Sequence, residues 1–128
     1  MAKQPVRTEN APAPFQGAPY SQGIVCGDLV FVSGQLGIDP ATGQVVDGGI
    51  GPQTERIMLN LQAILEEAGS SLDALVKTTI FLADLADFAA LNEVYARFVG
   101  DTPPARATFQ VAALPSGALV EIEAIASR

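Results

Sequence analysis

Lone charges interrupt the most apolar stretches near the C-terminus of this chain. Arg106 stands in the run RATFQVA, and Glu121 and Glu123 stand between aliphatic residues in LVEIEAIA. Because successive side chains of a strand point to opposite faces, Arg106, Thr108 and Gln110 are predicted to share one face of their strand. The two glutamates are predicted to share one face of theirs. We expect the two runs to be neighbouring strands, with Arg106 and the glutamates on the same side.

This pattern suits the binding and hydration of a small organic anion. An arginine guanidinium can hold a carboxylate through two parallel hydrogen bonds. A glutamate can hold and polarise a water molecule, or pass a proton. A structural ion pair between Arg106 and Glu121 or Glu123 is the simpler interpretation, because lone charges in strands are often just paired. The residues alone leave both interpretations open.

The composition excludes several other kinds of chemistry. The chain has no histidine and one cysteine, Cys26. This removes Ser-His and Cys-His nucleophilic pairs, an intramolecular disulfide and a zinc site built from cysteines. Cys26 lies in the apolar run GIVCGDLVF and is interpreted as a small core residue rather than a reactive thiol.

Charge and length narrow the class of protein further. Acidic residues number 14 against 7 scattered basic ones, giving a formal net charge of −7, so we expect neither a nucleic acid nor a membrane as partner. The sequence shows no signal-peptide core and no apolar run of about 18 residues, and a cytoplasmic location is expected. Residues 1–128 fit a single domain. With 48% apolar and 16% charged residues, part of the surface is expected to face other subunits.

Local patterns predict the elements that must position these charges. Residues 1–19 are expected to form an extended N-terminal arm. A hairpin should follow around Gly27 and Asp28, then a tight turn in DPATGQ and a short strand through Val45 and Val46. A helix is predicted within residues 48–71, with a buried stripe formed by Ile57, Leu61, Ile64, Leu65 and Ala68.

The second half repeats the change from strand to helix. The run ALVKTTIFLADL predicts a strand that buries Val76, Thr78, Ile80 and Leu82. Asp84 can cap a second helix, whose apolar stripe would consist of Phe88, Leu91, Tyr95, Phe98 and Val99. Two last strands follow. The order predicts an α+β fold, with about six strands and two helices on one sheet face. The other face carries few charges among aliphatic residues, which is typical of a subunit interface or cleft wall.

Several blocks of the sequence, in order, resemble a known family. They are APYSQGIVCGDLVFVSGQLGIDPATG, QT…N, VKTTIFLADLADFAALNEVY, PPAR and VEIEAIA. From about residue 11 to residue 126, the chain is similar to the RidA/YjgF family of enamine/imine deaminases. The resemblance implies a chorismate-mutase-like domain with a mixed sheet. It also implies a homotrimer with a barrel-like centre and ligand clefts between subunits.

The resemblance also implies a reaction and a set of site residues. Family members hydrolyse reactive 2-imino acids and enamines, such as 2-aminoacrylate, to 2-keto acids and ammonia, without a metal or cofactor. Arg106 would bind the substrate carboxylate, and Glu121 would position and activate water. Tyr20 would form a cleft wall contributed by the neighbouring subunit. The remaining substrate contacts would come from Ser33, Gly34, Asn92 and Thr108.

Two departures from the family pattern bear on substrate preference. Thr108 stands where many members have cysteine, and the run GAPY before Tyr20 is one residue longer than the common GPY. A different class of function is the alternative: a regulatory trimer that binds small carboxylates in the same cleft without turnover. RNA cleavage, which some members have been assigned, is disfavoured by the net charge and the absence of histidine.

Overall fold

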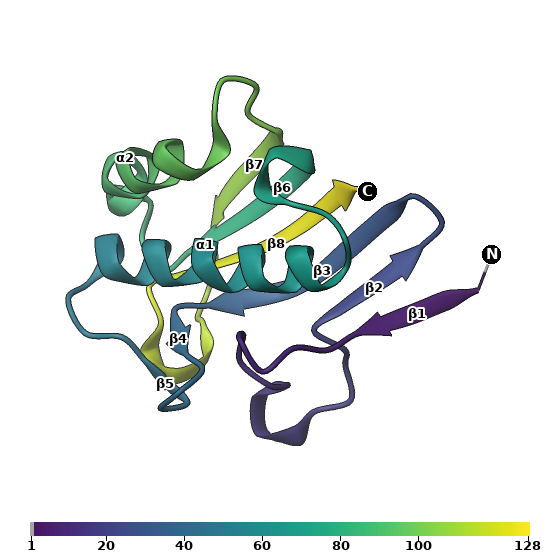
Figure 1. The fold of residues 1–128 in the computed structure, drawn as a ribbon. Coiled ribbons are helices and arrows are strands. Elements are labelled where there is room, and N and C mark those ends of the chain that lie inside the picture. The colour runs from purple at the N-terminus through teal and green to yellow at the C-terminus, as the bar shows by residue number, and fades with distance from the viewer. Residues whose placement is uncertain (1) are drawn as a thin grey trace.

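The computed structural model describes residues 2–128 and contains a six-stranded sheet with both long helices on one face (Figure 1). A separate ribbon pairs β4 (Ile38–Asp39) with β5 (Gln44–Val45). The predicted α+β fold is confirmed by this sheet and by helices α1 (Ile50–Glu67) and α2 (Phe88–Val99). The trimer stays a prediction. The strands lie side by side in the order β1 (Lys3–Val6), β2 (Gly23–Cys26), β3 (Leu29–Leu36), β8 (Val120–Ser127), β6 (Leu75–Leu82) and β7 (Ala105–Gln110).

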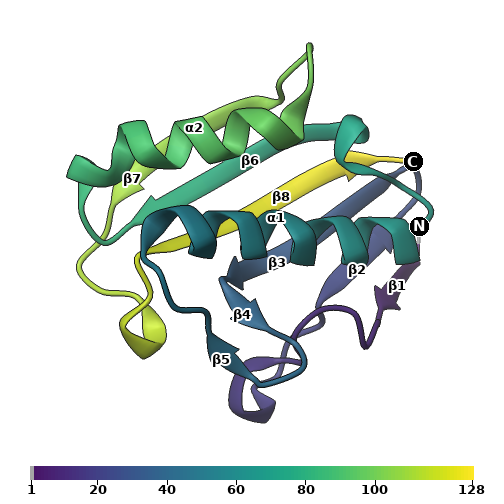
Figure 2. The same cartoon turned by 60° about the vertical axis from the view of Figure 1, so that its left-hand side comes forward.

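One parallel pair sets the topology of this sheet. β6 and β7 run parallel, whereas the other neighbouring strands are antiparallel. A parallel pair needs a crossover connection, and α2 provides it. The last strand, β8, then inserts between β3 and β6. Figure 2 shows α1 and α2 side by side over the same face of the sheet.

The predicted stripe of α1 forms the centre of the core. Ile57, Leu61, Ile64 and Leu65 are fully buried. They pack in one cluster with residues of the sheet, among them Ile80. Removing this much apolar surface from water is the main term that stabilises the fold.

The strand prediction for β6 is wrong at Val76. This side chain is 49% exposed, whereas its neighbour Leu75 is buried. The pairing of β6 with β8 shifts register between Leu75 and Lys77, and this irregularity turns Val76 away from the core. Thr78 and Ile80 are buried as predicted.

The stripe of the second helix is also shorter than predicted. Leu91, Tyr95 and Val99 are buried, but Phe88 at the first position of α2 is 42% exposed. Asp84 does act as a cap, although for the short 3-10 turn Leu85–Asp87 that precedes the helix. Its carboxylate accepts a hydrogen bond of 2.9 Å from the backbone N–H of Ala86.

The N-terminal arm is held in place by the side chain of Gln22. Its Nε2 donates to the carbonyls of Thr8, Ala11 and Pro12 at 2.8–3.2 Å, and its Oε1 accepts from the Thr8 N–H at 2.7 Å. The arm also adds β1 to the edge of the sheet. The six strands of the sheet therefore include one from the arm, while the strand predicted at Val45 lies in the separate ribbon.

Replacing Gln22 with leucine should destabilise the arm. The variant leaves backbone groups without partners in a buried setting, which costs about 1–3 kcal/mol for such a group. The loss should appear as a lower urea midpoint. Gln4→Leu, at an exposed glutamine of β1, is the matched control and should leave the midpoint nearly unchanged. An equal effect in both variants would contradict the role assigned to Gln22.

Candidate functional site

The strands that carry Arg106 and Glu121 are not neighbours, because β6 lies between β7 and β8. Arg106 is paired with Thr78, whose side chain is buried beneath the helices. Glu121 is paired with Phe81 on the same strand β6. Residues paired across strands point to the same face, and odd and even positions point to opposite faces. Arg106 therefore faces the helices and Glu121 faces the open side.

This geometry corrects the expectation that the two groups share one side of the sheet. It also contradicts a structural ion pair with either glutamate within one protomer, since Glu123 pairs with Thr79 and shares the face of Glu121. Strand alternation was predicted correctly. The strand order was not, because the parallel crossover moves β7 beyond β6.

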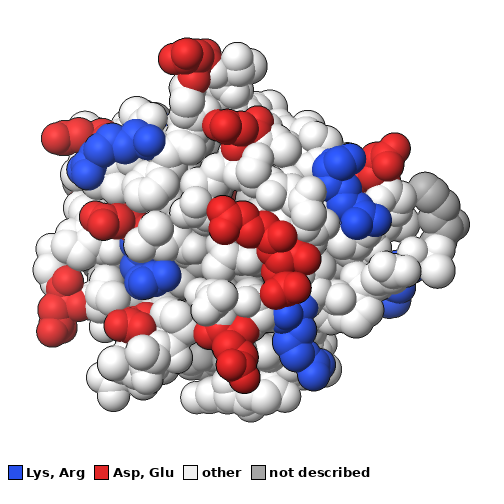
Figure 3. Space-filling model, viewed as in Figure 1, with Lys and Arg blue, Asp and Glu red and all other residues white. Residues whose placement is uncertain are grey.

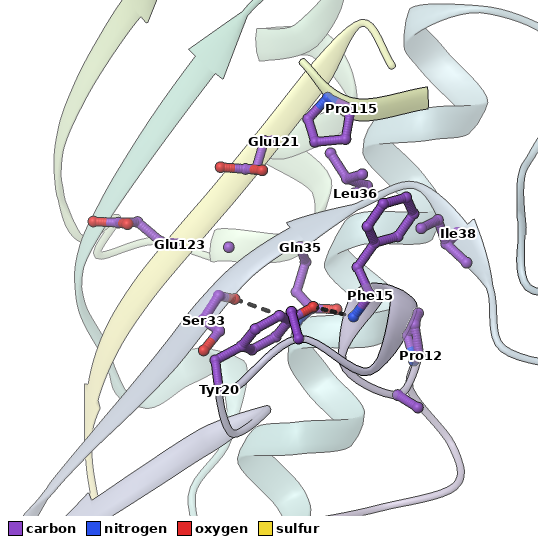
Figure 4. Close-up of a pocket in the computed structure, with 13 residues that line it drawn as sticks. Pro12, Phe15, Tyr20, Ser33, Gln35, Leu36, Ile38, Pro115, Glu121 and Glu123 are labelled. Atoms are coloured by element: carbon purple, nitrogen blue, oxygen red, sulfur yellow. Dashed lines mark hydrogen bonds between the residues drawn. The ribbon is translucent and has the colours of Figure 1, made fainter. Parts of the chain in front are cut away.

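A cleft of about 470 Å³ lies on the open side of the sheet beside Glu121 (Figure 4). Four residues assigned by resemblance meet there, namely Tyr20, Ser33, Gly34 and Glu121. We call them the carboxylate half-site. Glu123, which the strand pattern groups with Glu121, also lines the cleft. The other lining residues were not assigned to the site from the sequence; they are Pro12, Ala13, Phe15, Ala18, Gln35, Leu36, Ile38 and Pro115.

Gly34 is needed because the Glu121 side chain lies directly against it. A Cβ added at Gly34 would lie 2.8 Å from a carboxylate oxygen of Glu121. The β3–β8 register shifts between Val32 and Gln35, so Gly34 sits in a bulge. The bulge also frees Ser33, whose Oγ donates a 2.6 Å hydrogen bond to the Ser21 carbonyl.

Burial raises the pKa of Glu121, and the like charge of Glu123 raises it further. The carboxyl thus keeps its proton to a higher pH than an ordinary glutamate. A pKa moved toward neutrality suits a group that must both accept and return a proton.

Tyr20 forms a wall of this cleft in the same chain as Glu121. Its ring is 42% exposed, and its Oη accepts a hydrogen bond from the Phe15 N–H. Figure 4 shows the ring beside Ser33, below the two glutamates. Within one protomer, Tyr20 and Glu121 therefore line the same cleft, and a contribution of Tyr20 from a neighbouring subunit stays a prediction.

The remaining assigned residues gather on the helix side. Arg106 and Thr108 share one face of β7. On α2, Asn92 lies between Phe88 and Tyr95 on one face of the helix, at i−4 and i+3 spacing. We call Arg106, Asn92 and Thr108 the guanidinium half-site.

Two acceptors of the guanidinium half-site have no partner. The Oδ1 of Asn92 and the Oγ1 of Thr108 are buried and make no hydrogen bond within residues 2–128. Buried polar atoms are normally paired, so such a gap points to a missing ligand or partner group. The guanidinium of Arg106 itself contacts the rings of Phe88 and Tyr95.

Sequence reasoning missed the two rings beside Arg106. Phe88 and Tyr95 were assigned only to the core stripe, although their spacing around Asn92 was a usable signal.

Across residues 2–128, the structure contains no helix that is long and apolar enough to cross a membrane. The same residues contain no group of three or more His, Cys, Asp or Glu placed to hold a metal ion.

Comparisons with known proteins agree on one family. The family model described as Endoribonuclease L-PSP matches residues 8–128. A RutC family protein of Pyrococcus abyssi is 52% identical over 126 residues, covering 98% of each chain. A 2-iminobutanoate/2-iminopropanoate deaminase of Capra hircus is 44% identical, covering 98% of this chain and 90% of the relative. The crystal structure of RidA from an Antarctic Psychrobacter has a TM-score of 0.92 and 46% identity, covering 98% of this chain and 99% of that one.

The raised pKa of Glu121 has a testable effect on stability. The folded protein holds this proton more tightly than the unfolded chain, so stability falls as pH rises from about 4.3, the ordinary glutamate value, through the raised value. Glu121→Gln removes this loss. In urea unfolding at matched pH, the variant should be more stable than the parent at pH 8, with the difference disappearing at pH 4 and below.

Two further variants sharpen this measurement. Glu123→Gln removes only the second cause of the shift and should give part of the gain at pH 8. Glu55→Gln, at an exposed position on α1, removes one carboxylate outside the cleft and is the matched control. A loss of stability at pH 8 in Glu121→Gln would show that the charged carboxylate is stabilised by a partner, against the stated cause.

Proposed function

The chain belongs to the RidA/YjgF family, and on that basis we propose that it hydrolyses 2-imino acids and their enamine tautomers, such as 2-aminoacrylate, to 2-keto acids and ammonia. The observation that carries this proposal is the pair of half-sites. One offers a guanidinium that contacts two rings and, within residues 2–128, no carboxylate, and the other offers a carboxyl with a raised pKa. A relative at 44% identity that is named as such a deaminase supports it.

Each residue has a role that matches its surroundings. Arg106 binds the substrate carboxylate through its N–H donors. Asn92 and Thr108, whose buried acceptors lack partners, accept from the imine N–H or from water. Glu121 holds the attacking water in the cleft. Tyr20 closes the cleft and limits the entry of bulk solvent.

The chemistry needs only orientation and a proton shuttle. The water oxygen bonds to C2 while the C=N π electrons move to nitrogen, and Glu121 takes a water proton and returns it to that nitrogen. The resulting carbinolamine then loses ammonia: the hydroxyl proton passes through Glu121 to nitrogen as the C–N bond breaks and the C=O bond forms. No strong nucleophile is required, because the carbon is already electrophilic.

The proposal requires more than one copy of the chain. In one protomer, the two half-sites lie on opposite faces of the sheet, so a complete site needs the guanidinium half-site of one copy beside the carboxylate half-site of another. The homotrimer expected of the family would provide three such sites. RNA cleavage is less well supported. The chain has 7 scattered basic residues against 14 acidic ones, and such a surface binds the phosphates of a nucleic acid poorly.

A shared site predicts complementation between two inactive variants. Arg106→Ala and Glu121→Gln should each lower imino-acid turnover by more than about 100-fold. The two are then unfolded together in equal amounts and refolded. In a random mixed trimer, one site in four pairs an intact arginine with an intact glutamate, so roughly a quarter of parental activity should return.

Controls separate assembly from catalysis. Refolding either single variant with the double variant Arg106→Ala/Glu121→Gln should restore no activity above that of the single variant alone, because no site can then contain both groups. Native mass spectrometry should still show mixed trimers. If mixed trimers of the two single variants form but recover no activity, the proposal that two copies share one site is contradicted. If the parent binds 2-oxobutanoate but turns over no imino acid, the regulatory alternative replaces the enzyme.

A further inference from the structure

The guanidinium of Arg106 lies between two aromatic rings. Its Cζ is 5.4 Å from the centre of the Phe88 ring and 5.1 Å from that of the Tyr95 ring. Both distances fall within the range of a cation–π interaction, which extends to about 6 Å. The chain has 14 acidic residues, yet within the described protomer this half-buried cation contacts rings rather than a carboxylate.

The Tyr95 ring is held in place by a buried hydrogen bond to Thr78. Tyr95 is only 4% exposed, and its Oη is 2.7 Å from the Oγ1 of Thr78, which is completely buried. Thr78 is also the residue paired with Arg106 across β6 and β7. The strand neighbour of the arginine thus orients the ring against which the arginine packs. Three elements, β6, α2 and β7, meet in this arrangement.

The Tyr95 phenol does not neutralise the arginine. Burial raises the pKa of Tyr95, although the hydrogen bond to Thr78 and the charge of Arg106 act in the opposite direction. The ring is therefore a neutral phenol at physiological pH. A ring face attracts a cation without accepting any of its five N–H donors in a conventional hydrogen bond.

We propose that Phe88 and Tyr95 form an aromatic bracket that positions Arg106 while leaving its charge and its N–H donors free for the substrate carboxylate. Both are positioning residues, because they act through the arginine. The inference rests on the proposed function, in which Arg106 binds that carboxylate.

The bracket explains why an acidic residue is absent from this place. A carboxylate partner would also fix the side chain, but it would occupy the donors that the substrate needs and would have to be displaced on binding. Without any partner, ordering the long arginine side chain would cost binding free energy. Two ring faces hold the guanidinium in advance and leave it uncompensated.

Phe88→Leu is the primary test, because the ring is 42% exposed and its loss leaves the core intact. Loss of one cation–π contact should raise KM for an imino acid roughly 3- to 30-fold. The kcat should change by less than about twofold, since the carboxylate is bound in the ground state and the transition state alike. Phe88→Tyr keeps the ring face and should restore the parental KM.

A binding measurement makes the test independent of turnover. Calorimetry should show weaker binding of 2-oxobutanoate to Phe88→Leu by the same factor, and unchanged binding of the uncharged amide of that acid. Tyr95→Phe keeps the ring but loses the hydrogen bond to Thr78, and should give a smaller effect of the same kind. Phe98→Leu, at a partly buried ring of α2 packed against the core, should lower stability without changing KM.

The outcomes separate this inference from the proposed function. An unchanged KM in Phe88→Leu alongside a raised KM in Arg106→Ala would overturn the bracket and leave the proposed function standing. An unchanged KM in Arg106→Ala would overturn both. Equal losses for 2-oxobutanoate and its amide in Phe88→Leu would also overturn the bracket, because the effect would then not depend on the ligand charge.

Discussion

The parallel pairing of β6 with β7 decides where every charge of the candidate site lies. It requires α2 as a crossover, and it leaves the position between β3 and β6 for β8. Pairing Thr78 with Arg106 and Phe81 with Glu121 then sends the two charges to opposite faces. A slip of one residue in either ladder would put both on one side, and each would then be free to neutralise the other. The register therefore keeps the two charges apart and available.

The surroundings of each charge are consistent with this separation. Glu121 is half-buried beside a second carboxylate, so its pKa is raised, and within residues 2–128 no cation lowers it. Arg106 lies between rings instead of acids. Both arrangements cost stability compared with a direct ion pair, and both leave a group ready to react. Acidic residues outnumber basic ones 14 to 7, and Figure 3 shows acidic side chains scattered over one face of the molecule.

Local patterns were sufficient for most elements and insufficient for their arrangement. The α1 stripe and the alternation along β7 and β8 follow from periods of 3.6 and 2, which need no information about distant residues. Val76 was misplaced because a register shift is decided by the partner strand. Whether Arg106 and Glu121 share a face depends on the order and register of the strands in the sheet. The residue pattern within one strand does not determine that order. The rings around Arg106 were missed because Phe88 and Tyr95 satisfied the simpler interpretation as core residues.

The open face of the sheet links the site to assembly. It exposes Phe31 and Phe109, which are 41% and 52% accessible and lie on the same face as Glu121. Large exposed aromatics on a sheet with few charges are typical of a surface that another copy covers. Under the proposed function, a second copy that covers this face would also bring its guanidinium half-site beside Glu121. On that proposal a monomer would have no competent site, and turnover would report the oligomeric state directly.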